Sequence, residues 1–196
     1  MRDPRLDRWL AELVASPGLT AVRDLGEARR VHLDGSLAAL EHVRRFPGPI
    51  VDVGSGGGAP GIPIAATLPD REVTLLESSS RKCALLERLS REFPNVRVVR
   101  GRAEEQETDR FGVALAKALA PPPVAAEWCL PLVAPGGAAI LYVGPSADVA
   151  AVSRVAAQLA ATPPEVYPGL LVLRKLGATP AGFPRRPGVA RKRPLA

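Results

Sequence analysis

The stretch that decides the fold is Val51-Asp-Val-Gly-Ser-Gly-Gly-Gly-Ala-Pro-Gly61. An apolar run over 49–53 leads into it, and we expect that run to be a strand that turns into a helix. The glycines permit a tight turn and let a ligand approach the backbone closely. Glu77 ends the next apolar run, 19 residues after Gly58, where a carboxylate is placed to bind ribose hydroxyls. Residues 49–77 are therefore predicted to form the nucleoside-binding half of a Rossmann-like domain.

The glycine turn is compatible with two classes of nucleoside cofactor. Gly54, Gly56 and Ala59 fit the Gly-x-Gly-x-x-Ala pattern of a dinucleotide site, which is a weak signal by itself. Asp52 favours S-adenosylmethionine, because an acid two residues before the first glycine resembles the first motif of class I methyltransferases. In that motif the acid serves the methionine end of the ligand. A glycine-rich turn that binds no ligand is the alternative.

Composition limits the class of protein. The chain has 196 residues, of which 46% are hydrophobic and 4% aromatic, so we expect one α/β domain with a core of Ala, Val and Leu and a small extension. No apolar run approaches the roughly 18 residues of a membrane span, and the first residues lack a signal-peptide pattern. Cys83 and Cys129 are isolated and lack metal-ligand spacing. We therefore expect core thiols, no metal and a reducing, cytoplasmic setting.

The positive charge is concentrated at the C-terminal end. The net charge is +6, yet residues 1–173 contain 19 basic and 20 acidic residues, and from Arg174 onward there are seven basic residues and no acidic one. Prolines and glycines are expected to keep this segment extended and non-helical, as an arm that binds RNA phosphates. The alternative is a solvated tail that aids solubility. The cations assigned to RNA binding are Arg185, Arg186, Arg191, Lys192 and Arg193.

Hydrophobic periodicity predicts alternating strands and helices after two N-terminal helical segments, over 3–15 and 24–45. Such alternation implies a mostly parallel sheet with helices on both faces. We divide the chain into a helical cap (1–45), an α/β domain (46–176) and a basic Pro/Arg-rich tail (177–196). The seven expected strands cover 49–53, 72–76, 96–100, 111–116, 137–143, 164–167 and 170–175, with a hairpin at Pro168-Gly169, and the expected helices cover 60–68, 79–92, 123–133 and 147–160.

Several candidate residues follow the ends of these strands. Ligands of such sheets bind outside the carboxyl ends of the strands. Gly54 follows the first strand, Glu77 the second, Ala103-Glu104 the third and Lys117 the fourth. We therefore expect these residues to line one crevice.

Longer motifs carry a family resemblance over nearly the whole chain. Asp52-Val-Gly-Ser-Gly-Gly-Gly-Ala-Pro-Gly-Ile-Pro63 contains a Pro-Gly-Ile-Pro segment that ordinary methyltransferases lack. Thr74-Leu-Leu-Glu-Ser78 is followed by Arg81-Lys82, and Gly101-Arg-Ala-Glu-Glu105 follows the third strand. Phe183-Pro-Arg-Arg-Pro-Gly188 forms a C-terminal signature with Lys192-Arg-Pro-Leu195. In these motifs the chain resembles the ribosomal small-subunit methyltransferase G family, also called glucose-inhibited division protein B.

The resemblance implies transfer of a methyl group from S-adenosylmethionine to N7 of one guanine in a decoding-region loop of 16S rRNA. N7 carries a lone pair in the ring plane and needs no base to remove a proton, so catalysis can be mostly alignment of N7, methyl and sulfur. In agreement, the sequence has neither an Asn-Pro-Pro-aromatic motif nor a Pro-Cys pair, and we assign no catalytic side chain. The expected partner is 16S rRNA or the small ribosomal subunit, and we expect a monomer that does not bind membranes.

The resemblance also implies roles for the crevice residues. Glu77 would bind the ribose hydroxyls, and Ala103 and Glu104 would flank the adenine. Lys117 would contact the cofactor carboxylate or an RNA phosphate. The residues that bring the backbone of the turn to the cofactor are Gly54, Gly56, Gly58 and Ala59.

Four positions depart from the family pattern: Gly18 stands for an Asn, Lys117 for an Arg, Val143 for a Lys and Ala59 for an aromatic or bulky residue. Arg and Lys are not equivalent in bidentate contacts, so cofactor binding is better supported than turnover on the usual guanine. Two alternatives stay open: a methyltransferase of the same fold that acts on another RNA or a small molecule, and a non-catalytic RNA-binding relative. His32, in the N-terminal helices, is expected to be a capping or packing residue.

Overall fold

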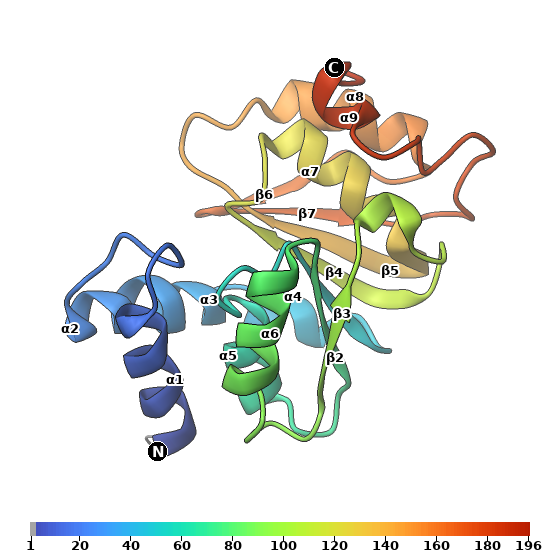
Figure 1. Ribbon diagram of the computed structural model, residues 1–196. Helices are drawn as coiled ribbons and strands as arrows, with labels where there is room; N and C mark the ends of the chain where they lie inside the picture. Colours follow the sequence, from blue (N-terminus) through green and yellow to red (C-terminus); the bar gives the residue numbers. More distant parts are fainter. Residues whose placement is uncertain (1–2) are drawn as a thin grey trace.

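Seven strands form one sheet at the centre of the molecule (Figure 1). The computed structural model describes residues 3–196. The strand order is β3-β2-β1-β4-β5-β7-β6; the pairs among β1 to β5 are parallel, and β7 is antiparallel to both β5 and β6. This confirms the mostly parallel, seven-stranded sheet expected from the sequence. The strands are β1 (Ile50–Val53), β2 (Val73–Glu77), β3 (Val96–Arg100), β4 (Phe111–Lys117), β5 (Val133–Tyr142), β6 (Glu165–Tyr167) and β7 (Leu170–Arg174).

The strand order reverses between β1 and β4. The chain moves outward from β1 to β2 and β3, and then returns to place β4 on the other side of β1. In register, Val51 lies between Thr74 and Ala114. Ligands of open α/β sheets bind beside such a reversal, at the carboxyl ends of the strands. The glycine turn after β1 and Glu77 at the end of β2 lie at that edge.

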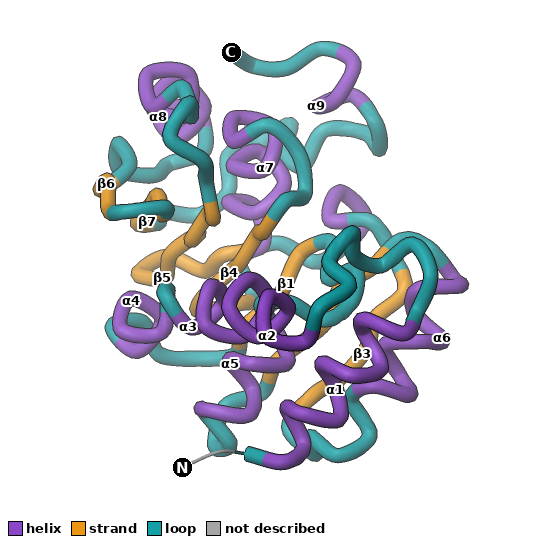
Figure 2. Tube along the Cα trace, turned by 90° about the vertical axis from the view of Figure 1, so that its left-hand side faces the viewer, coloured by secondary structure: helices purple, strands orange, loops and turns teal. Residues whose placement is uncertain are grey.

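Helices cover both faces of the sheet (Figure 2). Four of the helices that the structure describes begin at a side-chain cap; the Ser79 hydroxyl, for example, accepts from the Lys82 amide and starts the helix that follows Glu77. Among the described residues, no helix is long and apolar enough to cross a membrane. The helices are α1 (Pro4–Ala15), α2 (Leu25–Ala28), α3 (Gly35–Leu37), α4 (Leu40–Arg44), α5 (Gly61–Thr67), α6 (Ser80–Leu89), α7 (Pro122–Cys129), α8 (Val149–Gln158) and α9 (Val189–Lys192).

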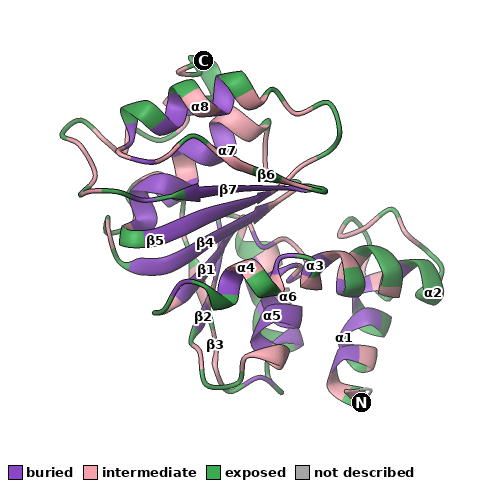
Figure 3. Ribbon diagram, turned by 180° about the vertical axis from the view of Figure 1, so that it is seen from behind, coloured by how far each residue is buried: buried purple, intermediate pink, exposed green. Residues whose placement is uncertain are grey.

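Alternation along the strands divides the core into two layers (Figure 3). Ile50 and Leu115 face the layer that contains α1, α4, α5 and α6. Val51 and Ala114, one residue away, face the layer that contains α7 and α8. Successive residues of a strand point to opposite faces, and the central strands are apolar at nearly every position because helices bury both faces.

The cap, defined as residues 3–45, has one helix that the sequence anticipates and a second region that is more irregular than expected. The segment expected to be helical over 24–45 begins with α2 and continues as a π-helix over Arg29–Asp34, followed by α3 and α4. The hydroxyl of Ser36 donates to the carbonyl of His32 at 2.5 Å. Hydroxyls that bond back to the preceding turn bend helices, which accounts for the interruptions.

Two further boundaries differ from expectation. The helix expected over 123–133 ends at Cys129, and a 3-10 turn over Leu130–Leu132 follows it. Pro131 lies in that turn and cannot donate a backbone hydrogen bond to continue the α-helix. As a result β5 begins at Val133, four residues before the expected start at 137.

The tail, defined as residues 177–196, was predicted to be extended and non-helical, and that prediction is wrong. Four residues that are neither Pro nor Gly form α9, and Ala190 within it is only 1% exposed. At the base of the tail, the buried ammonium of Lys175 donates to Asp109 Oδ1 at 3.2 Å, to the Leu130 carbonyl at 2.9 Å and to Thr179 Oγ1 at 2.8 Å. The tail therefore leaves the sheet from a fixed point and packs on the body of the protein.

Candidate functional site

The glycine turn after β1 is shaped by packing as well as by ligand access. Gly54, Gly56 and Gly58 have φ values of +71°, +56° and +94°, which favour glycine. A Cβ on Gly54 would lie 2.3 Å from Leu119 Cδ1, and one on Gly58 would lie 2.5 Å from Ile62 Cδ1. At Gly56, by contrast, the nearest described atom would be the carbonyl oxygen of Gly54, at 3.9 Å. The turn therefore leaves open space only on the side of Gly56.

The cap closes the other side of this turn. The indole nitrogen of Trp9 donates to the carbonyl of Gly57 at 3.0 Å, and a Cβ on Gly57 would lie 2.3 Å from Leu13 Cδ1. Gly57 belongs to no ligand-binding pattern, and its requirement for glycine comes from a helix more than 40 residues earlier. Sequence reasoning missed this contact.

Glu77 lies next to the glycine turn, as predicted. Its side chain is 6% exposed at the end of β2. One carboxylate oxygen accepts from the Gly56 amide at 3.1 Å, and the other accepts from the Ser79 amide at 2.8 Å. The Ser78 hydroxyl also donates to the latter oxygen, Oε1, at 3.5 Å, so the second lone pair of Oε2 is the acceptor capacity that Glu77 keeps at the edge of the turn.

Asp52 lies beneath the same turn and is 1% exposed. Its Oδ2 accepts from the Gly61 amide at 3.0 Å, and its backbone carbonyl accepts from the Ser55 hydroxyl at 2.8 Å. Burial raises the pKa of this carboxyl to about 7. A positive charge placed nearby would favour the ionised form.

Ala103 and Glu104 line a cavity of about 160 Å³ beside the turn. Glu104 Oε1 accepts from the Gly188 amide of the tail at 3.0 Å. The indole nitrogen of Trp128 is buried and has no hydrogen-bond partner among the described residues, and sequence reasoning missed this residue. The cavity is lined by Val53, Gly54, Leu76, Ser78, Gly101, Arg102, Ala103, Glu104, Leu119, Trp128 and Arg191.

Lys117 connects the sheet to the cap. Its ammonium donates to the carbonyl of Val31 at 2.7 Å and to the hydroxyl of Ser36 at 3.4 Å, and burial lowers its pKa. The hydroxyl of Tyr142 donates to the carbonyl of Ser36 in the same cluster. His32 shares a hydrogen bond of 2.8 Å with Thr20, which agrees with the expected packing role. Burial, with Lys117 second, lowers the pKa of His32.

The five tail cations do not behave alike. The guanidinium of Arg185 pairs with Glu127 on α7, with Nε–Oε1 at 2.5 Å and Nη2–Oε2 at 2.6 Å. Glu127 is 3% exposed, so Arg185 is used inside the protein. The other four, Arg186, Arg191, Lys192 and Arg193, are exposed.

A groove of about 440 Å³ separates the end of α1 from the start of α6. Arg81, Lys82 and Arg88 line it, and none of the described residues that line it is acidic, although Arg88 pairs with Glu12 on α1 at 3.0 Å. Gly18, one of the departures from the family pattern, also lies in this groove. Ser79 lines the groove, and the adjacent Ser78 lines the cavity beside the turn. The sequence signal for a basic groove is Arg81-Lys82, which we interpret from the sequence alone only as part of a family motif.

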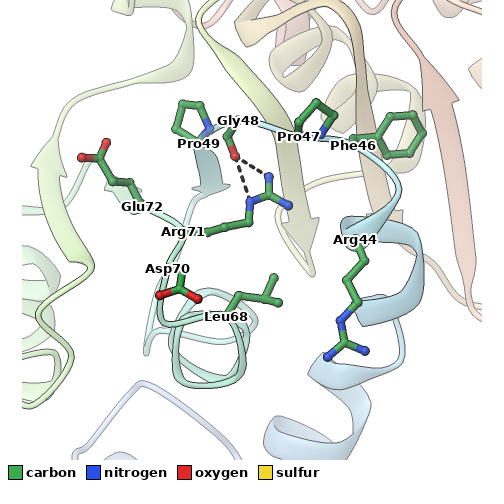
Figure 4. A pocket seen from close by; sticks show the side chains of 9 residues that line it. All are labelled: Arg44, Phe46, Pro47, Gly48, Pro49, Leu68, Asp70, Arg71 and Glu72. Carbon is green, nitrogen blue, oxygen red and sulfur yellow. Dashed lines mark hydrogen bonds between the residues drawn. The ribbon is translucent and has the colours of Figure 1, made fainter.

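A second large cavity, of about 530 Å³, lies at the opposite edge of the sheet (Figure 4). Pro49 precedes β1 there and Glu72 precedes β2. The Arg71 guanidinium donates to the carbonyls of Gly48 and Val43, the latter at 3.1 Å, and so closes the loop before β1. Because parallel sheets bind ligands at the carboxyl ends of their strands, we do not place the site here. Among the described residues, no group of three or more His, Cys, Asp or Glu is arranged to hold a metal ion.

Comparison with solved structures identifies the fold. An S-adenosylmethionine-dependent O-methyltransferase from Thermotoga maritima superposes with a TM-score of 0.62 at 13% identity, over 88% of this chain and 72% of that one. The CurJ carbon methyltransferase superposes with a TM-score of 0.60 at 13% identity, over 79% of this chain and 59% of that one. At this identity the likeness concerns the Rossmann-like fold alone.

Comparison of sequences identifies the family. The family model for rRNA small subunit methyltransferase G matches residues 5–161. Proteins named ribosomal RNA small subunit methyltransferase G from Synechococcus elongatus and Carboxydothermus hydrogenoformans are 35% and 36% identical over 90% of this chain, which is 82% and 83% of their lengths. The protein of that name from Thermotoga neapolitana is 35% identical over 96% of this chain and 89% of its own. The chain therefore belongs to the rRNA small subunit methyltransferase G family.

Proposed function

We propose that this chain transfers the methyl group of S-adenosylmethionine to N7 of a guanine in the decoding-region loop of 16S rRNA. The observation that carries the proposal is the family match over residues 5–161. The fold agrees with it, because the Glu77 carboxylate accepts a hydrogen bond from the glycine turn. The relatives that cover 90% of the chain are named as ribosomal RNA methyltransferases, which supports the same substrate class.

The residues at the carboxyl edge fit this cofactor. Glu77 would hold the ribose hydroxyls, and the space beside Gly56 would take the cofactor against the backbone of the Gly54–Gly58 turn, with Ala59 at its end. Ala103 and Glu104 would flank the adenine in a cavity with mixed apolar and polar walls, to which Trp128 contributes an indole donor without a partner among the described residues. Asp52 and Lys117 lie toward the methionine end.

The chemistry asks mainly for alignment. When bound, S-adenosylmethionine supplies an electrophilic methyl group on a positively charged sulfur. Guanine N7 has an available lone pair, so the protein has to hold the two reactants in line and exclude water. We assign no side chain to proton transfer.

The RNA is proposed to lie along two basic surfaces, one on each side of the cavity beside the glycine turn. One is the groove lined by Arg81, Lys82 and Arg88, and the other is the exposed side of the tail with Arg186, Lys192 and Arg193. The groove reaches Ser79, and the adjacent Ser78 lines the cavity that Arg191 of the tail also lines. Cations on both sides of the crevice would bind phosphates and bring a loop nucleotide to the cofactor.

The decisive experiment measures transfer of labelled methyl from S-adenosylmethionine to small ribosomal subunits that lack the modification. Naked 16S rRNA is tested in parallel, and the product is mapped by chemical cleavage at N7-methylguanine. The variant Glu77→Ala removes a carboxylate placed for the ribose, and we expect the affinity for the cofactor to fall about 10- to 100-fold, because hydrogen bonds to charged groups contribute about 1.5–3 kcal/mol. The matched control is Glu72→Ala, which removes an exposed carboxylate just before the other end of the same strand.

A single cleavage site in the decoding-region loop, lost in Glu77→Ala and kept in Glu72→Ala, would support the proposal. Label at another nucleotide, or in a small molecule, would favour a methyltransferase of the same fold with another substrate. RNA binding without label, in a protein that still binds the cofactor, would identify a non-catalytic relative.

A further inference from the structure

Beyond the clamp at Thr179, the tail is held on the body of the protein by polar contacts at two further points. Arg185 forms a bidentate pair with the buried carboxylate of Glu127. Three residues later, the Gly188 amide donates to Glu104 at 3.0 Å. Arg185 Nη2 also donates to the carbonyl of Arg193 at 2.9 Å, which joins the segment before α9 to the residue that follows it. Residues 185–193 are therefore fixed in one place.

Both contact points adjoin the cavity beside the glycine turn. Glu104 lines that cavity, and Trp128, the residue after Glu127 on α7, lines it too. Arg191 of α9 lines it from the tail. The tail thus contributes one wall. The volume of about 160 Å³ is below the roughly 300–1,000 Å³ of a pocket for a whole small molecule, and suits one end of a nucleoside cofactor.

Trp128, which lines the cavity, carries an unused donor. The Trp128 indole nitrogen is buried without a partner among the described residues. Buried polar groups are nearly always hydrogen-bonded, and an exception calls for a missing partner. Adenine carries several ring nitrogens that accept hydrogen bonds and has a flat face on which a guanidinium can stack.

We propose that the C-terminal tail is a wall of the adenine compartment, and that docking of the tail and binding of the cofactor reinforce each other. This rests on the proposed function, because it takes the cavity to be the adenine end of the S-adenosylmethionine site. Trp128 donates to an adenine nitrogen, and Arg191 covers the ring from the tail side. Arg185 is a positioning residue, since it acts through the tail.

The size of the coupling follows from the fraction of molecules with a docked tail. If the docked form binds the cofactor about tenfold more tightly than the undocked form, a substitution that undocks the tail in nearly all molecules raises the apparent Kd about tenfold. Linkage requires the bound cofactor to favour the docked tail by the same factor. RNA bound to the outer cations of the docked tail would likewise help to retain the cofactor.

The experiment uses the full chain and S-adenosylhomocysteine as the probe, which binds without turnover. Calorimetry gives its Kd, and mass spectrometry gives the rate at which trypsin cleaves after Arg191 and Lys192 with and without the probe. The variants are Arg185→Ala, Arg191→Ala and Trp128→Phe. The matched control is Arg186→Ala, which removes the same charge from the adjacent, exposed position.

We expect the probe to slow tail cleavage about tenfold in the wild type. Arg185→Ala should raise the Kd about tenfold and speed cleavage without the probe. Trp128→Phe should raise the Kd about threefold or more and leave cleavage without the probe unchanged. Arg191→Ala should raise the Kd by a similar factor, and Arg186→Ala should stay within twofold of the wild type.

Three results would overturn the proposal. The wild type could bind the probe while cleavage stays the same, or a folded Arg185→Ala could bind the probe as tightly as the wild type or more tightly. A wild type that does not bind the probe at all would reject the cofactor site and the coupling together, which separates the two failures. Should Arg185→Ala not fold, Arg191→Ala and Trp128→Phe decide, because no hydrogen bond ties either side chain among the described residues.

Discussion

The cap and the tail both reach the carboxyl edge of the sheet, but different forces hold them there. The cap buries Trp9, Leu10 and Leu13, each at most 3% exposed, and packs two of them against the glycine turn. The tail adds only the small Ala190 and the partly buried Phe183 and Leu195 to the core, and beyond Thr179 its polar attachment depends on Arg185 with Glu127 and on Gly188 with Glu104. The cap is therefore part of the folded core, whereas the tail can open locally without unfolding the domain.

The largest effect should come from the cap. Trp9→Ala removes a buried ring and a hydrogen bond to Gly57, and large-to-small changes of this kind cost about 3–5 kcal/mol of the free energy of unfolding. Urea denaturation measures it. The control is Leu25→Ala in the same cap, at a side chain that is 54% exposed, with an expected loss below about 0.5 kcal/mol. A small loss for Trp9→Ala would show that the cap is not part of the core.

A substitution in the tail should lower the free energy of unfolding less than one in the cap, and it should affect only the tail. Arg185→Ala leaves a buried carboxylate without its partner, but an undocked tail lets water reach Glu127. We therefore expect about 1–3 kcal/mol, less than the 3–5 kcal/mol typical of breaking a fully buried pair. Hydrogen exchange should accelerate over 188–193 and stay unchanged in β1, with Arg186→Ala as the control. Loss of protection in β1 as well would make the tail as integral as the cap.

A change of pH should alter the free energy of unfolding through Asp52, beneath the glycine turn. Burial raises the pKa of Asp52 in the folded state to about 7, above its ordinary 3.8. The stability contributed by a carboxyl with a raised pKa is fully present below about pH 4 and is lost as the pH rises toward 7, at up to about 1.4 kcal/mol per pH unit. The free energy of unfolding of the wild type, relative to that of Asp52→Asn, should therefore fall between pH 5 and pH 7. A difference that does not change with pH would contradict this.

The smallest effect should be on the salt dependence of RNA binding, which distinguishes cations of the tail from a cation of the cap. Arg186→Ala or Arg193→Ala should each reduce the slope of log K for RNA against log salt by about one, because each removes one phosphate contact. Stability should change by less than about 0.5 kcal/mol. Arg30→Ala removes an exposed cation of the cap that pairs with Glu27, and it should leave the slope unchanged. Equal slopes for all three variants would mean that the tail does not face the RNA.

Local patterns sufficed to predict the sheet and the position of Glu77. A strand, a glycine turn, a helix and a second strand that ends in an acid follow one another within residues 49–77, and the topology rules for α/β sheets leave few other arrangements. The hairpin at the C-terminal end of the sheet could be predicted for the same reason. The start of β5 could not, because Pro131 ends α7 early and the chain immediately becomes extended.

Contacts between distant residues could not be predicted from the pattern. Gly57 needs to be glycine because of Leu13, and charge counting made Arg185 an RNA ligand although it faces a carboxylate 58 residues away. One signal was present in the sequence: Glu127 is the only charged residue between Lys117 and Asp148. A single acid in an apolar helix needs a cation when the helix is buried, and the cation had to come from elsewhere in the chain.

The buried clamp at Lys175 has a practical consequence for protein engineering. Lys175 holds Thr179 and Asp109 at the base of the tail, and Arg185 holds the next fixed point. Between them Ala181 and Gly182 are exposed, and Gly182 has open space where a side chain would begin. Exposed loops between fixed points tolerate added residues well. A fluorescent reporter domain inserted at 181–182 would leave both clamps intact, and its signal could follow docking of the tail in real time.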